Sequence, residues 1–296
     1  MKDQTTKRYF WVTLLNIVIT IAEFCGGFIS GSLSLLSDAV HNLSDVGAII
    51  ISFVAHLISN RKRNQIKTFG YERAETLAAF TNGIILIFIS LSLFAEAIER
   101  FWQPTKINGG VMLIVSIIGL LANVISMLTM HQDAQGSLNV RSTFLHMLSD
   151  ALSSVAVVIG AIFIYFWQVS LLDPIMTLVV SIFVLREAYQ ITKQAANVLM
   201  ESNPDIDLDQ VNKIVLAIPA IKNIHHVHIW RYSDDYIMLD AHVNVAPDLT
   251  VQEFEKLTQQ LSHDLQKLGI NHLNFQAECD RGKYDEMIVS QQKSEN

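Results

Sequence analysis

The chain has 296 residues, of which 51% are hydrophobic and 17% charged, and its formal net charge is −7. The charged fraction lies well below the roughly 25% of soluble domains, which argues against a disordered chain, and the acidic balance argues against a nucleic-acid binder. Because residues 1–200 carry a net charge of +1 and residues 201–296 one of −8, the composition predicts a nearly neutral hydrophobic body followed by an acidic domain.

Six stretches in the first 200 residues are long and apolar enough to cross a lipid bilayer, which takes about 20 mostly apolar residues. They are Phe10–Phe28, Leu33–Ser59, Ala74–Ala97, Gly110–Met130, Phe144–Phe166 and Leu171–Ile191. Turn-forming and charged residues separate them. We therefore expect residues 1–200 to form a membrane domain of six transmembrane helices.

The distribution of Lys and Arg sets the expected orientation, since these residues concentrate in cytoplasmic loops. With both termini in the cytoplasm, eleven of them up to residue 200 fall inside and only Arg100 and Lys106 fall outside. The sequence thus predicts a multi-pass protein with cytoplasmic N- and C-termini. Cys25 and Cys279 lie one in each part and suggest no disulfide framework, which fits a second domain in the reducing cytosol.

Residues 201–284 have the pattern of a small soluble α+β domain. The expected order is αββαβ: a helix at Leu208–Ile218, strands at Ile221–Trp230 and Tyr236–Val245, a helix with an apolar stripe from Val251 to Leu265, and a strand at Ile270–Glu278. This order favours a small sheet with helices on one face. Residues 285–296 are polar and are expected to be disordered.

One short motif occurs twice within the predicted spans. His41-Asn-Leu-Ser-Asp45 lies in the second span and His146-Met-Leu-Ser-Asp150 in the fifth. Residues i and i+4 share one face of a helix, so each span presents one imidazole and one carboxylate together. Two such helices facing each other supply a tetrahedral His2Asp2 site, which suits Zn²⁺ or Co²⁺ better than Mg²⁺ or Ca²⁺.

The alternative is that each His–Asp pair is an ordinary hydrogen-bonded contact between helices. Two matching pairs make a metal site the stronger interpretation, because a carboxylate at bilayer depth costs about 2.5–3.5 kcal/mol on insertion scales. A ligating imidazole must also be neutral, so metal and protons compete for these groups. A site that holds either Zn²⁺ or H⁺, exposed alternately to the two sides, is the minimum machinery of an antiporter.

Other charged residues are candidates for supporting roles. Glu23 and Asp38 are candidates for a proton path or for contacts that orient the site. Arg73 is a candidate partner of Asp205 or Asp207, in a pair that would lock the tail to the membrane body. The alternative for Arg73 is a solvated positive charge at the cytoplasmic face.

Several segments together carry a family resemblance: Ser32–Asp45, Phe69–Glu75, His146–Asp150, Asp173-Pro174 and Leu199–Pro204. Over roughly Arg8 to Glu278 the sequence resembles the cation diffusion facilitator family of zinc and heavy-metal transporters. The resemblance implies a homodimeric, proton-coupled exporter of cytosolic Zn²⁺, rather than an enzyme, with a metallochaperone-like cytoplasmic domain. It implies a transport site made of His41, Asp45, His146 and Asp150, and the two histidines imply selectivity for zinc over cadmium.

The sequence departs from the family pattern in two loops. Some members carry an extra metal site before the third span, but the matching positions here hold Asn64, Lys67 and Tyr71, which are poor ligands or none, so we expect no site there. Eukaryotic members often have a long His-rich link between spans four and five, where this chain has only His131 in a short polar link. We therefore expect a bacterial plasma (inner) membrane protein.

The resemblance further implies a metal site in the cytoplasmic domain that holds Zn²⁺ as a regulatory ligand. Its ligands would be His225, His242 and Glu278. Two further family ligand positions hold Phe254 and Gln276, which leaves the site incomplete. Candidates to complete it are His226, His228 and Cys279. The alternative is that these are surface histidines of a soluble domain.

Three other functions deserve comparison. A membrane zinc protease would carry an H-E-x-x-H motif and leave one coordination position open for water, whereas this sequence lacks the motif and supplies four ligands. A channel would show repeated polar rings, and a metal sensor would not need six spans. The sequence therefore predicts a proton-coupled antiporter that exports Zn²⁺, with Co²⁺ and Cd²⁺ as further cargo, by alternating access.

Overall fold

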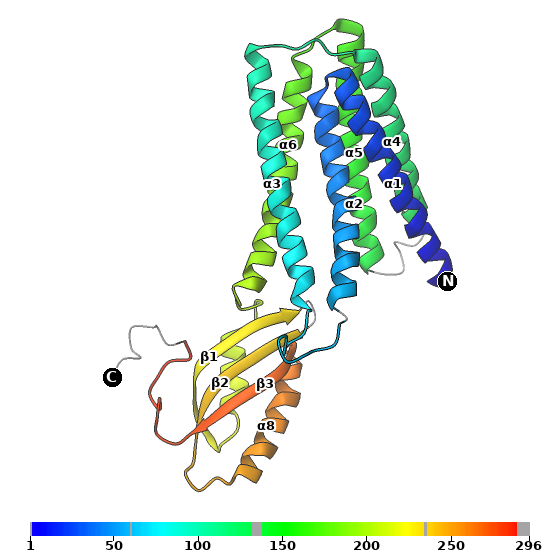
Figure 1. Cartoon of the computed structure of the whole chain (residues 1–296). Helices are drawn as coiled ribbons and strands as arrows, with labels where there is room; N and C mark the ends of the chain where they lie inside the picture. Colours follow the sequence, from blue (N-terminus) through cyan, green and yellow to red (C-terminus); the bar gives the residue numbers. More distant parts are fainter. Residues whose placement is uncertain (1, 60, 132–137, 234–235, 289–296) are drawn as a thin grey trace. The chain divides into compact units, whose positions relative to one another are not determined.

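The computed structural model describes residues 2–59, 61–131, 138–233 and 236–288 (Figure 1). Within its helices, some side chains lie outside this description, among them those of Asp45 and His146. Contacts divide the chain into two units, which we call the helical unit (Met1–Ala55 with Ala78–Lys193) and the α/β unit (His56–Leu77 with Gln194–Asn296). Most of the predicted disordered segment 285–296 falls outside the described residues.

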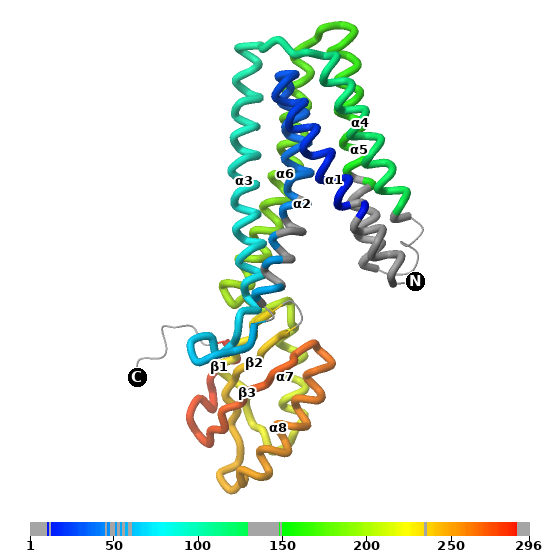
Figure 2. Tube along the Cα trace, turned by 45° about the vertical axis from the view of Figure 1, so that its right-hand side comes forward, coloured from blue at the N-terminus to red at the C-terminus, as the bar shows by residue number. Residues whose placement is uncertain are grey.

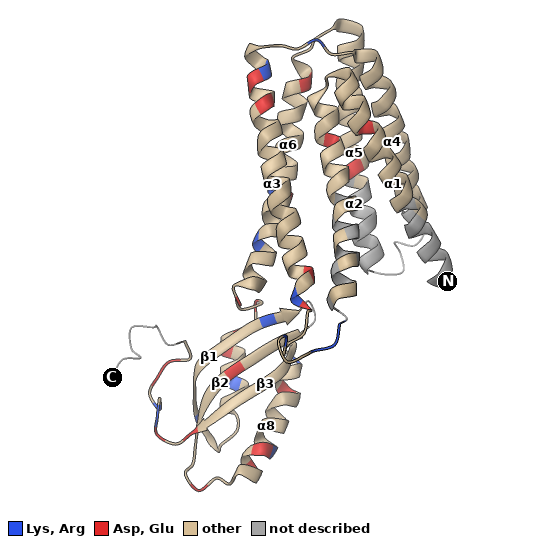
Figure 3. Cartoon of the chain, in the orientation of Figure 1, with Lys and Arg blue, Asp and Glu red and all other residues tan. Residues whose placement is uncertain are grey.

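Long helices overlap all six predicted spans. They are α1 (Lys2–Ser30), α2 (Leu33–Ser59), α3 (Arg73–Trp102), α4 (Gly109–His131), α5 (Leu138–Trp167) and α6 (Leu172–Leu199). Among the described residues, five of these helices are long and apolar enough to cross a membrane. The sixth, α2, is also long, but part of it lies outside the described side chains. Charged residues are sparse along the helices (Figure 3), as a bilayer interior requires.

Helix α2 packs against neighbours on two sides and so occupies a central place in the helical unit. One buried cluster joins it to α4 and α5, through Leu35, Met112, Val157, Ala161 and Ile164. A second joins it to α3 and α6, through Val40, Leu86 and Ala188. The motif carried by α2 is therefore held against both helix groups.

One buried carboxylate ties the ends of three helices together. Asp173, in the first turn of α6, is 0% exposed and accepts hydrogen bonds from the hydroxyls of Ser32 and Ser34 at 2.6 and 2.7 Å. It also accepts from the backbone N–H groups of Leu33 and Ser34 at 2.8 and 3.1 Å, and so caps the N-terminus of α2. The guanidinium of Arg100 on α3 lies 3.7 Å from the same carboxylate.

The α/β unit contains the predicted αββαβ order. Its elements are α7 (Leu208–Leu216), β1 (Ile221–Ser233), β2 (Tyr236–Val245), α8 (Val251–Gln266) and β3 (Ile270–Glu278). The strand order is β1-β2-β3, with β1 antiparallel and β3 parallel to β2. Helices α7 and α8 lie beside the sheet (Figure 2), and their apolar side chains complete its core, which includes Val211, Val215, Leu261 and Leu265.

Strand β1 is interrupted by a bulge that regular alternation did not predict. The register shifts between His225 and His228, and His226 has a positive φ of 52°. The extra residue explains why Ile224 and Val227 both enter the core although they are three positions apart. The backbone N–H of Val227 donates to the carbonyl of Met287 at 2.8 Å, so the C-terminal segment helps to hold the bulge.

The segment before α3 packs within the α/β unit. The Tyr232 hydroxyl donates to the carbonyl of Phe69, and burial raises the pKa of Tyr232. At the start of α3, Arg73 pairs with Glu201 at 3.0 Å, so the prediction that it pairs with Asp205 or Asp207 was wrong. Asp207 instead caps α7 by accepting from the backbone N–H of Asp209, and Asp205 lies in a turn with a positive φ of 62°.

Candidate metal sites

The first candidate site lies between α2 and α5. The Nε2 atom of half-buried His41 is 3.1 Å from Oδ1 of Asp150, whose exposed fraction is 6%. Two ligands of a tetrahedral Zn²⁺ lie roughly 3.3–3.6 Å apart, given metal–ligand distances of about 2.0–2.2 Å. The contact joins one member of each predicted His–Asp pair. Its length of 3.1 Å is close to the separation expected for two ligands of one Zn²⁺.

The other two predicted ligands, Asp45 and His146, have side chains outside the described set. Their backbone positions are helical, one turn after His41 on α2 and one turn before Asp150 on α5. The sequence pattern thus remains the basis for including them.

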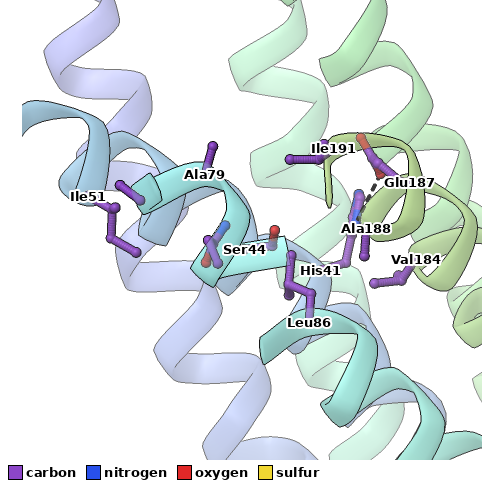
Figure 4. A pocket seen from close by; sticks show the side chains of 11 residues that line it. His41, Ser44, Ile51, Ala79, Leu86, Val184, Glu187, Ala188 and Ile191 are labelled. Carbon is purple, nitrogen blue, oxygen red and sulfur yellow. Dashed lines mark ion pairs between the residues drawn. The ribbon is translucent and has the colours of Figure 1, made fainter. Parts of the chain in front are cut away.

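A third carboxylate, which the sequence reasoning missed, approaches the same histidine. Oε2 of Glu187 on α6 is 3.9 Å from Nδ1 of His41, and Figure 4 marks this ion pair with a dashed line. The two ring nitrogens of His41 therefore face two different carboxylates. The available signal was that Glu187, beside Arg186, lies inside the predicted sixth span, where ionisable residues are by default functional candidates.

A cavity of about 90 Å³ opens beside His41. Its polar lining comes from His41, Ser44, Asn82 and Glu187, and apolar residues of α2, α3 and α6 form the remainder (Figure 4). Since a water molecule occupies about 30 Å³ of liquid, this space has room for a few waters. Glu187, which also lines this cavity, is 47% exposed, so polar side chains of α2, α3 and α6 meet beside His41.

Two further buried carboxylates, Glu23 and Asp38, lie near the pair. Oε2 of Glu23 on α1 accepts a 2.7 Å hydrogen bond from the side chain of Asn42, the residue after His41. On α4, a Cβ at Gly119 would clash with Oε1 of Glu23, so glycine leaves room for this carboxylate. Asp38 is 3% exposed and hydrogen-bonds the side chain of Ser153 on α5. Both carboxylates therefore contact the helices that carry the motif.

The second candidate site lies in the α/β unit, where the structure brings His225, His242 and Glu278 together. Their ligand atoms lie within 4.8 Å of one another. Nε2 of His225 and Nδ1 of His242 are each 3.2 Å from the Glu278 carboxylate. His225 and His242 are cross-strand partners on β1 and β2, which places their side chains on one face of the sheet.

The surroundings of this trio favour a neutral His242 ring and a tight fit around His225. Burial lowers the pKa of His242, although Glu278 opposes the shift, and a neutral ring is the form that binds metal. Gly282 has a φ of +64°, and a Cβ there would clash with Nε2 of His225. Gln276, which stands where the family has a ligand, donates a 2.7 Å hydrogen bond to Glu278.

The other residues considered for this domain take different places. Phe254 packs against the hydrophobic core. Among the described residues, the group that could hold a metal ion consists of the trio and does not include His226, His228 or Cys279. In the loop before α3, Asn64 accepts from the backbone N–H groups of Ile66 and Lys67 and donates to the Tyr71 hydroxyl, so these side chains shape a turn.

Comparisons with known proteins agree with this organisation. Residues 10–200 match the family model described as the cation efflux transmembrane domain, and residues 203–278 match the model of the cation efflux protein cytoplasmic domain. The chain is 40% identical to the cadmium, cobalt and zinc/H(+)-K(+) antiporter of Bacillus subtilis, over 99% of this chain and 96% of that protein.

Two other relatives are more distant. Zinc transporter ZitB of Escherichia coli is 36% identical, over 94% of this chain and 88% of the relative. Metal cation efflux system protein CzcD of Cupriavidus metallidurans is 36% identical, over 87% and 82%. The chain therefore belongs to the cation diffusion facilitator family of metal-efflux transporters and combines a multi-pass membrane domain with a cytoplasmic C-terminal domain.

Proposed function

We propose that this protein is a proton-coupled antiporter that exports Zn²⁺ from the cytoplasm across the bacterial inner membrane. The observation that carries the proposal is the 3.1 Å contact between His41 on α2 and Asp150 on α5. The names of the relatives above, which include cadmium, cobalt and zinc, support Zn²⁺ as cargo with Co²⁺ and Cd²⁺ as further substrates.

The transport site consists of two imidazoles and two carboxylates, which close a tetrahedron around Zn²⁺. Its members are His41, Asp45, His146 and Asp150. Both imidazoles must be neutral to bind the ion, so each binding event displaces protons that the empty site holds. Competition between Zn²⁺ and H⁺ for one set of groups couples their opposite movements.

Glu187 is the residue that orients His41. Histidines that bind metals usually donate their second ring N–H to a carboxylate, which fixes the tautomer and the ring orientation. Nδ1 of His41 faces Glu187 across 3.9 Å, a separation that a bridging water spans. Nε2 is then the nitrogen available to the ion, on the side of Asp150.

Transport proceeds as the helices alternate between inward-open and outward-open arrangements around this site. Zn²⁺ enters from the cytoplasm and displaces protons, and incoming protons release it on the other side. Glu23, which is bonded to Asn42 of α2, and Asp38 of α2, which is bonded to Ser153 of α5, are both buried and are the candidates for carrying protons to and from the site.

The cytoplasmic domain acts as the regulatory part of a homodimer. Three ligands, His225, His242 and Glu278, hold a second Zn²⁺ and leave one coordination position open. The net −8 of residues 201–296 attracts divalent cations and opposes close approach of two such domains until metal screens the charge. Metal-loaded domains therefore favour the tighter dimer.

Reconstituted vesicles test the transport proposal. We expect Zn²⁺ uptake by the wild type to fall at least ~10-fold in Asp150→Asn, because the variant loses an anionic ligand. Asp248→Asn, a change at an exposed loop position, is the matched control and keeps wild-type uptake. Wild-type uptake by Asp150→Asn would remove the four-ligand site from the account.

A further inference from the structure

The side chains of His226 and His228 approach each other on the exposed side of β1. Their Nε2 atoms are 3.3 Å apart and their ring planes are perpendicular, with centroids separated by 4.8 Å. Both residues are exposed. The nitrogen separation matches the roughly 3.3–3.4 Å expected for two imidazoles bound to one tetrahedral Zn²⁺ at about 2.0–2.1 Å.

The β-bulge brings this pair together. In a regular strand, a residue next to His225 would point to the opposite face, but the bulge between His225 and His228 inserts a residue and changes the direction of His226. The positive φ of His226, at 52°, is a conformation that residues other than glycine adopt at a cost. The hydrogen bond from Val227 to Met287 helps to hold it.

The neighbours of the pair favour a cation. The ring of His226 lies 4.7 Å from that of His242, a member of the buried trio. Asp240 pairs with His228 across the strands, so its carboxylate lies on the same face of the sheet. An ion at the pair would therefore lie beside, and separate from, the His225–His242–Glu278 group.

We propose that His226 and His228 form a second divalent-cation site of the cytoplasmic domain. Two imidazole nitrogens bind the ion and water completes its coordination. Nitrogen ligands select borderline metals such as Zn²⁺ and Co²⁺ over Mg²⁺ and Ca²⁺. The exposed position lets the site take ions directly from solution, next to the buried trio. This inference goes beyond the proposed transport function and does not depend on it.

The test counts Zn²⁺ bound per chain, by equilibrium dialysis of the purified full-length protein in detergent. The starting variant carries Asp150→Ala and Glu278→Gln, which weaken the other two candidate sites, so the result does not depend on transport. To this variant we add His226→Asn or His228→Gln. Asparagine tolerates positive φ better than most residues, and His228 lies beyond the strained position, so the two changes perturb the fold differently.

We expect either added change to remove one bound Zn²⁺ per chain and to remove the visible absorption that Co²⁺ gives at this site. The control is His263→Gln, an exchange of a histidine on α8, which leaves the count unchanged. An unchanged count in His228→Gln would overturn the proposal and reduce the pair to a hydrogen bond between imidazoles. An equal loss in the His263→Gln control would also overturn it, since binding would then be nonspecific.

Discussion

His41 contacts two carboxylates from different helices, and this makes it the residue on which the transport proposal depends most. Asp150 faces its Nε2 atom and Glu187 its Nδ1 atom. The repeated motif predicted the approach of His41 to Asp150. It gave no information on Glu187, because that residue belongs to no repeat and reaches His41 only through the packing of α6 against α2.

Glu187→Gln tests the orienting role. We expect the KM for Zn²⁺ in vesicle transport to rise about 10-fold, in line with carboxylates that orient metal-binding histidines, while Glu187→Asp recovers part of the loss. Glu99→Gln, which neutralises an exposed carboxylate on α3, serves as control. Unchanged KM in Glu187→Gln, or no recovery in Glu187→Asp, would show that the carboxylate does not orient His41.

Gly119 offers a second test at the scale of single residues. In Gly119→Ala the new methyl group would clash with the buried Glu23 carboxylate, so we expect a loss of about 1–3 kcal/mol in stability from overpacking. Gly110→Ala on the same helix is the control, because its methyl group would meet other atoms at 3.5 Å or more. Equal thermal unfolding midpoints in detergent for the two variants would contradict the close contact.

At the scale of elements, hydrophobicity was enough to locate the helices, while side-chain hydrogen bonds set how their ends meet. The bounds of α2 and β3 are those predicted from the pattern. The bulge in β1 was not predicted, because it rests on a contact with Met287, sixty residues away in sequence. Asn244 on β2 is a polar residue that is buried, and its side-chain NH2 group donates to the carbonyls of Cys279 and Arg281.

Asp173 is the element-scale prediction. In Asp173→Asn one carboxylate oxygen becomes an NH2 group, which cannot accept hydrogen bonds. The variant then loses an acceptor either for the backbone N–H of Leu33, which donates to Oδ2, or for the donors of Ser32 and Ser34, which share Oδ1. We expect a loss of at least ~2 kcal/mol, because buried donors are left unsatisfied. The thermal unfolding midpoint in detergent measures this. A midpoint equal to that of the surface variant Asp248→Asn would contradict the capping role.

The capping box of α8 is a smaller, separate case. Thr250 accepts from the backbone N–H of Glu253, whose carboxylate accepts in return, and these hydrogen bonds lower the pKa of Glu253. The lowered pKa means that the box is intact above the ordinary carboxyl pKa and weakens as the pH falls through the folded value. Thr250→Ala should lower the stability of the α/β unit by about 1 kcal/mol, measured by thermal unfolding. Thr258→Ala on the same helix is the control, and equal midpoints would rule out the box.

At the scale of the whole molecule, the division of charge takes on a physical meaning. The nearly neutral part contains the membrane helices, with few charged side chains, and the acidic part contains the trio and the exposed histidine pair. Sequence alone predicted the ligand candidates of the transport site and the His225–His242–Glu278 trio. It did not predict that Gln276 would donate to Glu278 or that Gly282 would lie against His225, because those contacts depend on how the end of β3 and the turn after it meet β1.

Zinc/proton exchange in sealed vesicles tests the central claim most directly. Vesicles carrying the full-length protein are given a pH gradient, and zinc movement and internal pH are recorded together, with His41→Ala as the inactive comparison. We predict that Zn²⁺ moves against the direction of H⁺, that reversing the gradient reverses it, and that His41→Ala abolishes both fluxes. A Zn²⁺ flux whose rate and direction do not depend on the pH gradient, or that is unchanged in His41→Ala, would contradict the account.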